Sequence, residues 1–169
     1  MSRKRRKEKV QLSPVVVVSW VCSRDYPLLP VHQKTIRRLS QDITIIYVWD
    51  KTEKDAKPPI VSSDNTMIVG SDFDRKGNLN DKACISQMID FYARLVAKGV
   101  QKIIKCDCDT IITDLGWTMG NGSCGFHCSN HYGWTGCCYC LDAATITGIK
   151  GYLHTHDIQP HGGYKMPED

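Results

Sequence analysis

Two carboxylates one residue apart form the clearest chemical motif in the sequence, Asp107-Cys108-Asp109. On an extended chain alternate side chains point to the same side, so the two acids would converge on one cation. Oxygen ligands of this kind favour Mg²⁺ or Mn²⁺ over zinc. Taken alone, such a pair more often belongs to a turn, and its place in the fold decides between the two interpretations.

A second group of potential metal ligands lies between residues 124 and 140. The spacing Cys124-X3-Cys128 followed by Cys137-X2-Cys140 falls in the range of zinc knuckles and ribbons. Strand alternation argues against a site that uses all of them, because Cys138 and Cys140 would face one side and Cys137 the other. Buried, reduced thiols are the preferred interpretation. The group also contains His127 and His131.

Apolar runs predict the strands that would position the carboxylates. The run at 15–22 is continuous and rich in β-branched residues, which is typical of a strand covered on both faces in a parallel sheet. Further strands are expected at 43–49, 66–70 and 102–106, and the last of these leads directly into Asp107. In an open α/β sheet ligands bind beyond the carboxyl ends of the strands, which is where this motif falls.

Helical periodicity separates these strands. A short helix is expected at 31–39 after Pro30, and a long one from about residue 80 that Gly99 ends. The alternation predicts an α/β fold with a mainly parallel sheet flanked by helices. Beyond Asp114 the chain is rich in Gly and Cys, and a β-segment at 136–141 followed by a helix at 142–150 predicts a small antiparallel region.

Composition and charge fit a single domain of 169 residues. Six Lys or Arg stand within residues 1–9, and without them the chain is close to neutral. We expect a basic, disordered tail over 1–12, able at most to contact an anionic membrane surface weakly, and a domain over 13–169. Nucleic-acid binding is not expected.

The apolar run at 15–22 is too short to span a bilayer or to act as an export signal. A cytoplasmic protein with reduced cysteines is therefore expected.

In order and spacing, these segments resemble those of GT-A glycosyltransferases, specifically inverting, DXD-containing enzymes of the bacterial family-2 type. The resemblance covers the chain from Val15 to Asp169. It is carried by the opening strand, the acid Asp50 after the second strand, the Gly-Asn-Leu-Asn stretch 77–80, the motif at 105–110, the glycine-led segment 136–141 and the terminal 167–169.

The resemblance implies a GT-A fold and a metal-dependent transfer of a sugar from a nucleotide-diphosphate donor, expected to be a UDP-sugar. The acceptor would be a hydroxyl of a glycan, a lipid-linked sugar or a protein, and the transferred group a hexosyl or N-acetylhexosaminyl unit. Asp107 and Asp109 would hold Mn²⁺ or Mg²⁺, with Asp109 the firmer ligand, and Asp169 would be the catalytic base. The remaining implied residues are Ser19, Asp50, Asn78, Asn80 and Asp107 for the nucleotide-sugar, and Trp134, Gly136 and Glu168 on the acceptor side.

The sequence departs from that family at its end, and two other functions stay open. Family members continue past the Glu-Asp motif with a helix that shapes the acceptor site, so a domain incomplete at its C-terminus is expected. A zinc-stabilised Cys/His binding module without catalysis is the main alternative. A nucleotidyltransferase-like domain is weaker, because its phosphate loop needs glycine after the first strand and none occurs in residues 23–27.

Overall fold

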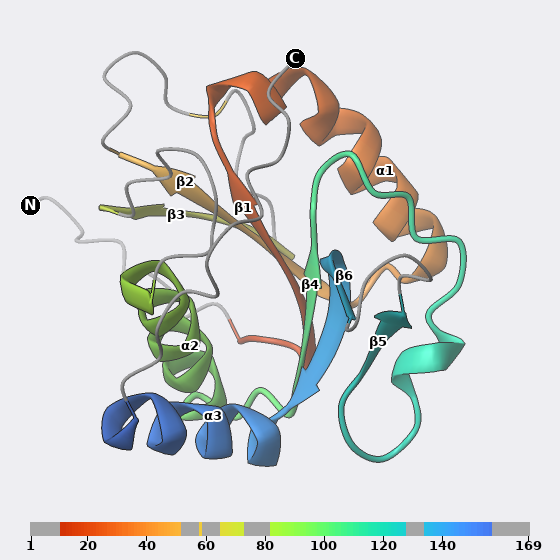
Figure 1. The fold of residues 1–169 in the computed structure, drawn as a ribbon. Helices are drawn as coiled ribbons and strands as arrows, with labels where there is room; N and C mark the ends of the chain where they lie inside the picture. The colour runs from red at the N-terminus through yellow and green to blue at the C-terminus, as the bar shows by residue number, and fades with distance from the viewer. Residues whose placement is uncertain (1–10, 52–57, 59–64, 73–81, 128–133, 157–169) are drawn as a thin grey trace, which may run out of the picture.

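The computed structural model describes residues 11–51, 58, 65–72, 82–127 and 134–156. Within them, six strands form one sheet with helices on both faces, which confirms the predicted α/β class (Figure 1). The predicted strands are present within one or two residues of their expected bounds. They are β1 (Val15–Val21), β2 (Thr44–Asp50), β3 (Thr66–Ser71) and β4 (Lys102–Cys106).

The sheet is parallel in its larger part and antiparallel at one side. Its strand order is β3-β2-β1-β4-β6-β5, where β5 is Cys124–His127 and β6 is Trp134–Asp142. The pairs β3-β2, β2-β1 and β1-β4 are parallel, whereas β6 runs antiparallel to both β4 and β5. The Gly/Cys-rich region is therefore the antiparallel part, as predicted, and β5 is an addition that its short, mixed sequence did not indicate.

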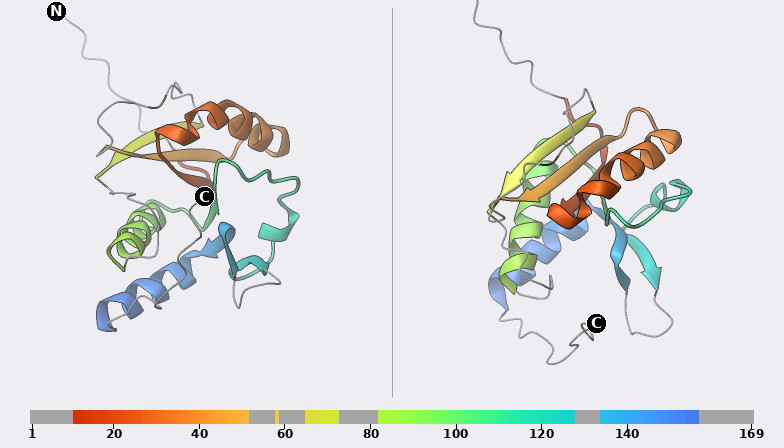
Figure 2. Two further views of the ribbon diagram at one scale, coloured as in Figure 1. Left: turned by 45° about the horizontal axis from the view of Figure 1, so that its top comes forward. Right: turned by 90° about the horizontal axis from the view of Figure 1, so that it is seen from above.

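Both faces of the sheet are covered. Helix α1 (Leu29–Leu39) lies on one face, and α2 (Lys82–Val96) and α3 (Ala143–Thr155) lie on the other (Figure 2). Alternate residues of β1 enter the two cores, because Val16 and Val18 pack on the side of α2 and Val17 on the side of α1. This explains why the run in β1 is continuously apolar rather than alternating.

Local chemistry sets the helix boundaries. Pro30 stands in the first turn of α1, where its missing N–H costs no hydrogen bond. After α2 the chain turns at Gly99, whose φ of +96° favours glycine, and its N–H donates to Val96 O at 2.9 Å. Asp142 caps α3 by accepting from the N–H of Thr145 at 2.7 Å. Helix α3 extends to Thr155, beyond the predicted end at 150.

Parts of the predicted organisation lie outside the described residues. These are residues 1–10 of the basic tail, most of the loop after β2, the stretch 73–81 before α2 and the C-terminal 157–169. Predictions about them stay predictions. Among the helices that the structure describes, none combines the length and apolarity that a membrane crossing requires.

Candidate functional site

The carboxyl ends of the four parallel strands lie along the same edge of the sheet, and the order in which strands are added changes direction between β1 and β4. From β1 the sheet extends through β2 to β3, and the chain then returns to place β4 on the other side of β1. The point between β1 and β4 is therefore a topological switch point, where open α/β sheets bind ligands beyond the carboxyl ends of their strands. Val21 and Cys106, the last residues of these two strands, mark the candidate site.

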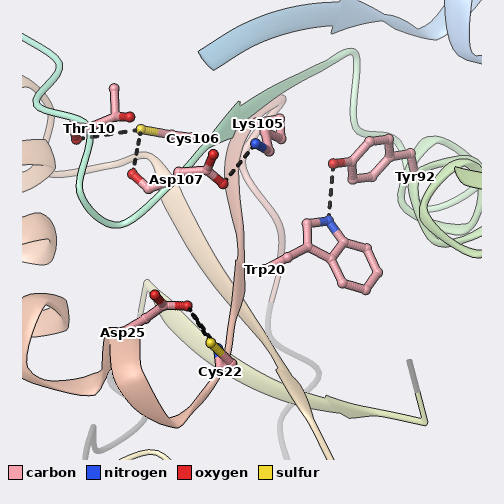
Figure 3. A network of polar contacts seen from close by, with 8 residues as sticks. All are labelled: Trp20, Cys22, Asp25, Tyr92, Lys105, Cys106, Asp107 and Thr110. Atoms are coloured by element: carbon pink, nitrogen blue, oxygen red, sulfur yellow. Dashed lines mark hydrogen bonds and ion pairs between the residues drawn. The ribbon is translucent and has the colours of Figure 1, made fainter. Parts of the chain in front are cut away.

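The acidic motif follows β4 at this edge, but it forms a turn. The N–H of Thr110 donates to Asp107 O at 3.0 Å. The sulfur of Cys106 lies 3.4 Å from Asp107 O and 3.7 Å from Thr110 O (Figure 3). The expectation of an extended chain across the motif was therefore wrong, because these contacts curl the segment back on the strand end. Strand alternation does not set the relative directions of the two carboxylates.

Asp107 and Asp109 have different neighbours. The Asp107 carboxylate lies 2.7 Å from the ammonium of Lys105, with 24% of its side chain exposed. Asp109 is exposed, and its charge acts on His32 of α1. Asp107 is thus tied to the face covered by α2 and α3, while Asp109 borders the α1 side. Asp109 is the carboxylate with more freedom to meet a cation from solvent.

His32 is a buried polar residue near the site that the sequence did not single out. Burial lowers its pKa to about 4, against an opposing effect of Asp109, so the imidazole is neutral near pH 7. Its Nδ1 lies 3.0 Å from the hydroxyl of Tyr47, and its Nε2 has no hydrogen-bond partner among the described residues. Nothing in the sequence around His32 indicates that this histidine is buried, because the residues that follow it in the helix are mostly polar.

After β1 the chain is held by the carboxylate of Asp25, and no glycine-rich loop follows the strand. Asp25 Oδ2 accepts from the N–H of Cys22 at 2.9 Å and contacts its sulfur at 3.2 Å (Figure 3). This closes the first turn of the 3₁₀ helix η1 (Ser23–Leu28), which leads from β1 into α1. The chain thereby turns away from the edge directly after β1.

The predicted nucleotide-binding residues are only partly brought together. Asp50 is the last residue of β2 and 4% exposed, so it reaches the same edge as Asp107 and Asp109. Ser19 lies two residues before the end of β1 and is fully buried, and its Oγ has no partner among the described residues. Asn78 and Asn80 lie outside the described residues.

The antiparallel strand β6 returns to this edge from the other direction. Cys138 is paired with Cys106, so the start of β6, with Trp134 and Gly136, continues past the end of β4. The structure describes only the backbone of these two residues. Glu168 and the predicted base Asp169 lie outside the part of the chain that the structure describes.

The cysteines of the antiparallel region face one another in pairs. Cys106 is opposite Cys138, and Cys124 is opposite Cys140. A hydrogen bond to Cys138, together with burial, raises the pKa of Cys106, and burial raises that of Cys140 to about 12. None of the described cysteines forms a disulfide. Within the described ranges no three His, Cys, Asp or Glu residues could hold a metal ion; Cys128 and His131 lie outside those ranges.

Lys105 is the most unusual residue that sequence reasoning missed. It is 1% exposed and lies near the carboxyl end of β4, two residues before Asp107. The alternation of strand positions was the available signal, since it places Lys105 on the same face as the buried Ile103.

No protein-family model matches the chain, and no curated protein is similar to it.

Proposed function

We propose that the protein is a metal-dependent glycosyltransferase of the GT-A type, which moves a sugar from a nucleotide-diphosphate donor to an acceptor hydroxyl with inversion. The observation that carries the proposal is the acidic turn at the switch point. It follows a buried parallel strand and offers an exposed carboxylate, Asp109, two residues after a second one, Asp107. Asp50 and the start of β6 share that edge, as a site joining donor and acceptor would need.

The residues present suit a hard divalent cation. Asp109 is exposed and supplies carboxylate oxygens, which Mn²⁺ and Mg²⁺ prefer. Because Oδ1 of Asp107 contacts Lys105, only Oδ2 remains to bind the cation or a hydroxyl of the donor. Asp109 is accordingly the main ligand in the proposal. When bound, the cation would offset the negative charge that grows on the departing diphosphate.

Transfer with inversion also needs a base on the acceptor side. The acceptor oxygen forms a bond to the anomeric carbon, the bond from that carbon to the diphosphate oxygen breaks, and the base takes the hydroxyl proton. Asp169 is proposed for this role and Glu168 for acceptor contact. Trp134 and Gly136 are proposed to border the acceptor because β6 brings them to the edge of Asp107.

Calorimetric titration of UDP and UDP-sugars in the presence of Mn²⁺ tests the donor site. We expect a Kd between about 1 µM and 1 mM that requires the metal and is lost in EDTA. Asp109→Asn should weaken binding at least about tenfold, since it removes the exposed charge. Asp114→Asn is the matched control, because Asp114 is also exposed in the same loop and an asparagine can still accept from Gly116 N. Binding that persists in EDTA and in Asp109→Asn would refute the proposal.

Metal analysis separates this proposal from the Cys/His module. Protein purified without added ions should contain no stoichiometric zinc if the thiols are only core residues. About one tightly bound zinc per chain, whose removal unfolds the protein, would favour the module instead.

A further inference from the structure

A lysine is buried inside the sheet directly beneath the acidic turn. Lys105 is 1% exposed and is held between Val18 of β1 and Tyr139 of β6, its partners in the two strand pairings. Moving an ammonium group out of water is unfavourable unless a partner compensates its charge. Lys105 is paired on both sides within the sheet, so its buried ammonium needs a partner of opposite charge.

That partner is Asp107, and the contact has a defined direction. The Lys105 ammonium lies 2.7 Å from Asp107 Oδ1 and 5.9 Å from the centre of the Tyr139 ring. Figure 3 shows the Asp107 carboxylate turned from the acidic turn toward Lys105, on the side of Trp20 and Tyr92. Among the described residues no hydrogen bond accompanies the ion pair at Oδ1. The orientation of Asp107 therefore depends on Lys105.

The aromatic residues near the pair are buried and hydrogen-bonded to one another. Trp20 Nε1 donates to the hydroxyl of Tyr92 at 3.1 Å, and Tyr92 is fully buried. Tyr139 forms a hydrogen bond with Tyr92 that contributes to the pKa of both, after the larger effect of burial. Tyr139, whose ring faces the Lys105 ammonium, is thus linked through Tyr92 to Trp20 of β1.

We propose that Lys105 is a positioning residue of the metal and donor site: it fixes the Asp107 carboxylate so that the turn presents its remaining oxygen and Asp109 in one arrangement. The inference rests on the proposed function, because it assigns Lys105 a role in that same site. Residues that orient metal-binding carboxylates through a direct contact commonly change metal affinity about 10 to 100-fold when removed.

Electrostatics alone predicts the opposite result, which makes the test decisive. Lys105→Met removes a positive charge near the cation site, and by charge alone it should tighten Mn²⁺ binding. If Lys105 acts by positioning, the same substitution weakens Mn²⁺ binding at least about tenfold. Free Mn²⁺ counted by electron paramagnetic resonance gives the affinity without any nucleotide. Lys150→Met is the control, since Lys150 forms an exposed ion pair with Asp90 at 2.9 Å.

A double variant avoids an unpaired buried charge and tests whether Lys105 affects Mn²⁺ affinity through Asp107. In Lys105→Met/Asp107→Asn both charges are absent, so no unpaired buried charge remains. If Lys105 acts only through Asp107, the double variant binds Mn²⁺ as weakly as Asp107→Asn alone. Should Lys105→Met fail to fold, Lys105→Gln takes its place, because it removes the same charge with a polar side chain.

The outcomes are distinct. Weakened binding in Lys105→Met, or in Lys105→Gln where the first variant does not fold, supports the positioning role. Equal or tighter binding in Lys105→Met, or a further loss in the double variant, overturns it while leaving the proposed function intact. Wild-type protein that binds no Mn²⁺ contradicts the proposed function and the positioning role with it.

Discussion

Trp20 donates from its indole Nε1 to the hydroxyl oxygen of Tyr92 at 3.1 Å, and this hydrogen bond joins β1 to α2 inside the sheet-helix core. The Trp20 ring also packs edge-on against both Tyr92 and Phe91. Because Trp20 and Tyr92 are almost wholly buried, water cannot replace the bond if it is lost. The contact aligns α2 with the strand whose end forms one side of the candidate site.

Tyr92→Phe should therefore destabilise the protein while leaving its shape unchanged. It removes the hydrogen bonds of the Tyr92 hydroxyl to Trp20 and Tyr139, and the loss of buried hydrogen bonds costs about 1 to 3 kcal/mol. Urea unfolding followed by circular dichroism measures the change. Tyr152→Phe is the matched control, because Tyr152 is 53% exposed and should give a change close to zero. Equal effects of the two substitutions would mean that the buried hydrogen bond contributes nothing.

His32 should make the stability depend on pH. Its pKa falls from 6.5 to about 4 on folding, mainly because the ring is buried, so the unfolded chain binds the proton more tightly. Stability is then fully present above about pH 6.5 and is lost as the pH falls toward 4, by on the order of 3 kcal/mol. Unfolding free energies at pH 7.5 and pH 4.5 measure this.

The variant His32→Gln isolates that contribution. It should lose less stability than the wild type between the two pH values, whereas His154→Gln, at an exposed position of α3, should follow the wild type. A His32→Gln protein with an unchanged pH dependence would show that other groups dominate the acid transition.

Two glycine-to-alanine substitutions should change stability in opposite directions. Gly99 has a φ of +96°, which alanine adopts poorly, so Gly99→Ala should cost about 1 kcal/mol although nothing lies within 4 Å of the added carbon. Gly148 is exposed in the middle of α3 with equally open surroundings, so Gly148→Ala should stabilise by about 0.5 to 1 kcal/mol. Thermal unfolding gives both signs. A stabilising Gly99→Ala would contradict the left-handed turn after α2.

The cap of α3 gives a further test. Asp142→Ala removes the acceptor of the Thr145 N–H and should cost about 1 kcal/mol, while Asp142→Asn keeps an oxygen there and should cost clearly less. Chemical denaturation of the two variants separates the cap from the general effect of altering β6. Comparable losses in both would point to the charge of Asp142 rather than to its capping bond.

The sequence by itself determined the elements whose signals are local. The apolar run of β1, the helical spacing of Met88, Ile89 and Tyr92 in α2, and the turn at Gly99 each depend on neighbours within a few residues. Such patterns placed five strands and three helices near their observed bounds, and they placed Asp107 directly after β4. Whether the acidic motif binds a metal and a nucleotide-sugar stays a prediction.

Only the tertiary structure decided what surrounds that motif. Lys102 and Lys105 look alike in the sequence Lys-Ile-Ile-Lys, yet Lys102 donates to the carbonyls of Thr118 and Gly120 at the surface, while Lys105 is enclosed. The difference comes from Tyr139 of β6 and from the curl that brings Asp107 back over the strand end. Strand alternation indicates the face of the sheet on which Lys105 lies, but its burial and its ion pair depend on which distant strands become neighbours, and no local pattern encodes that choice.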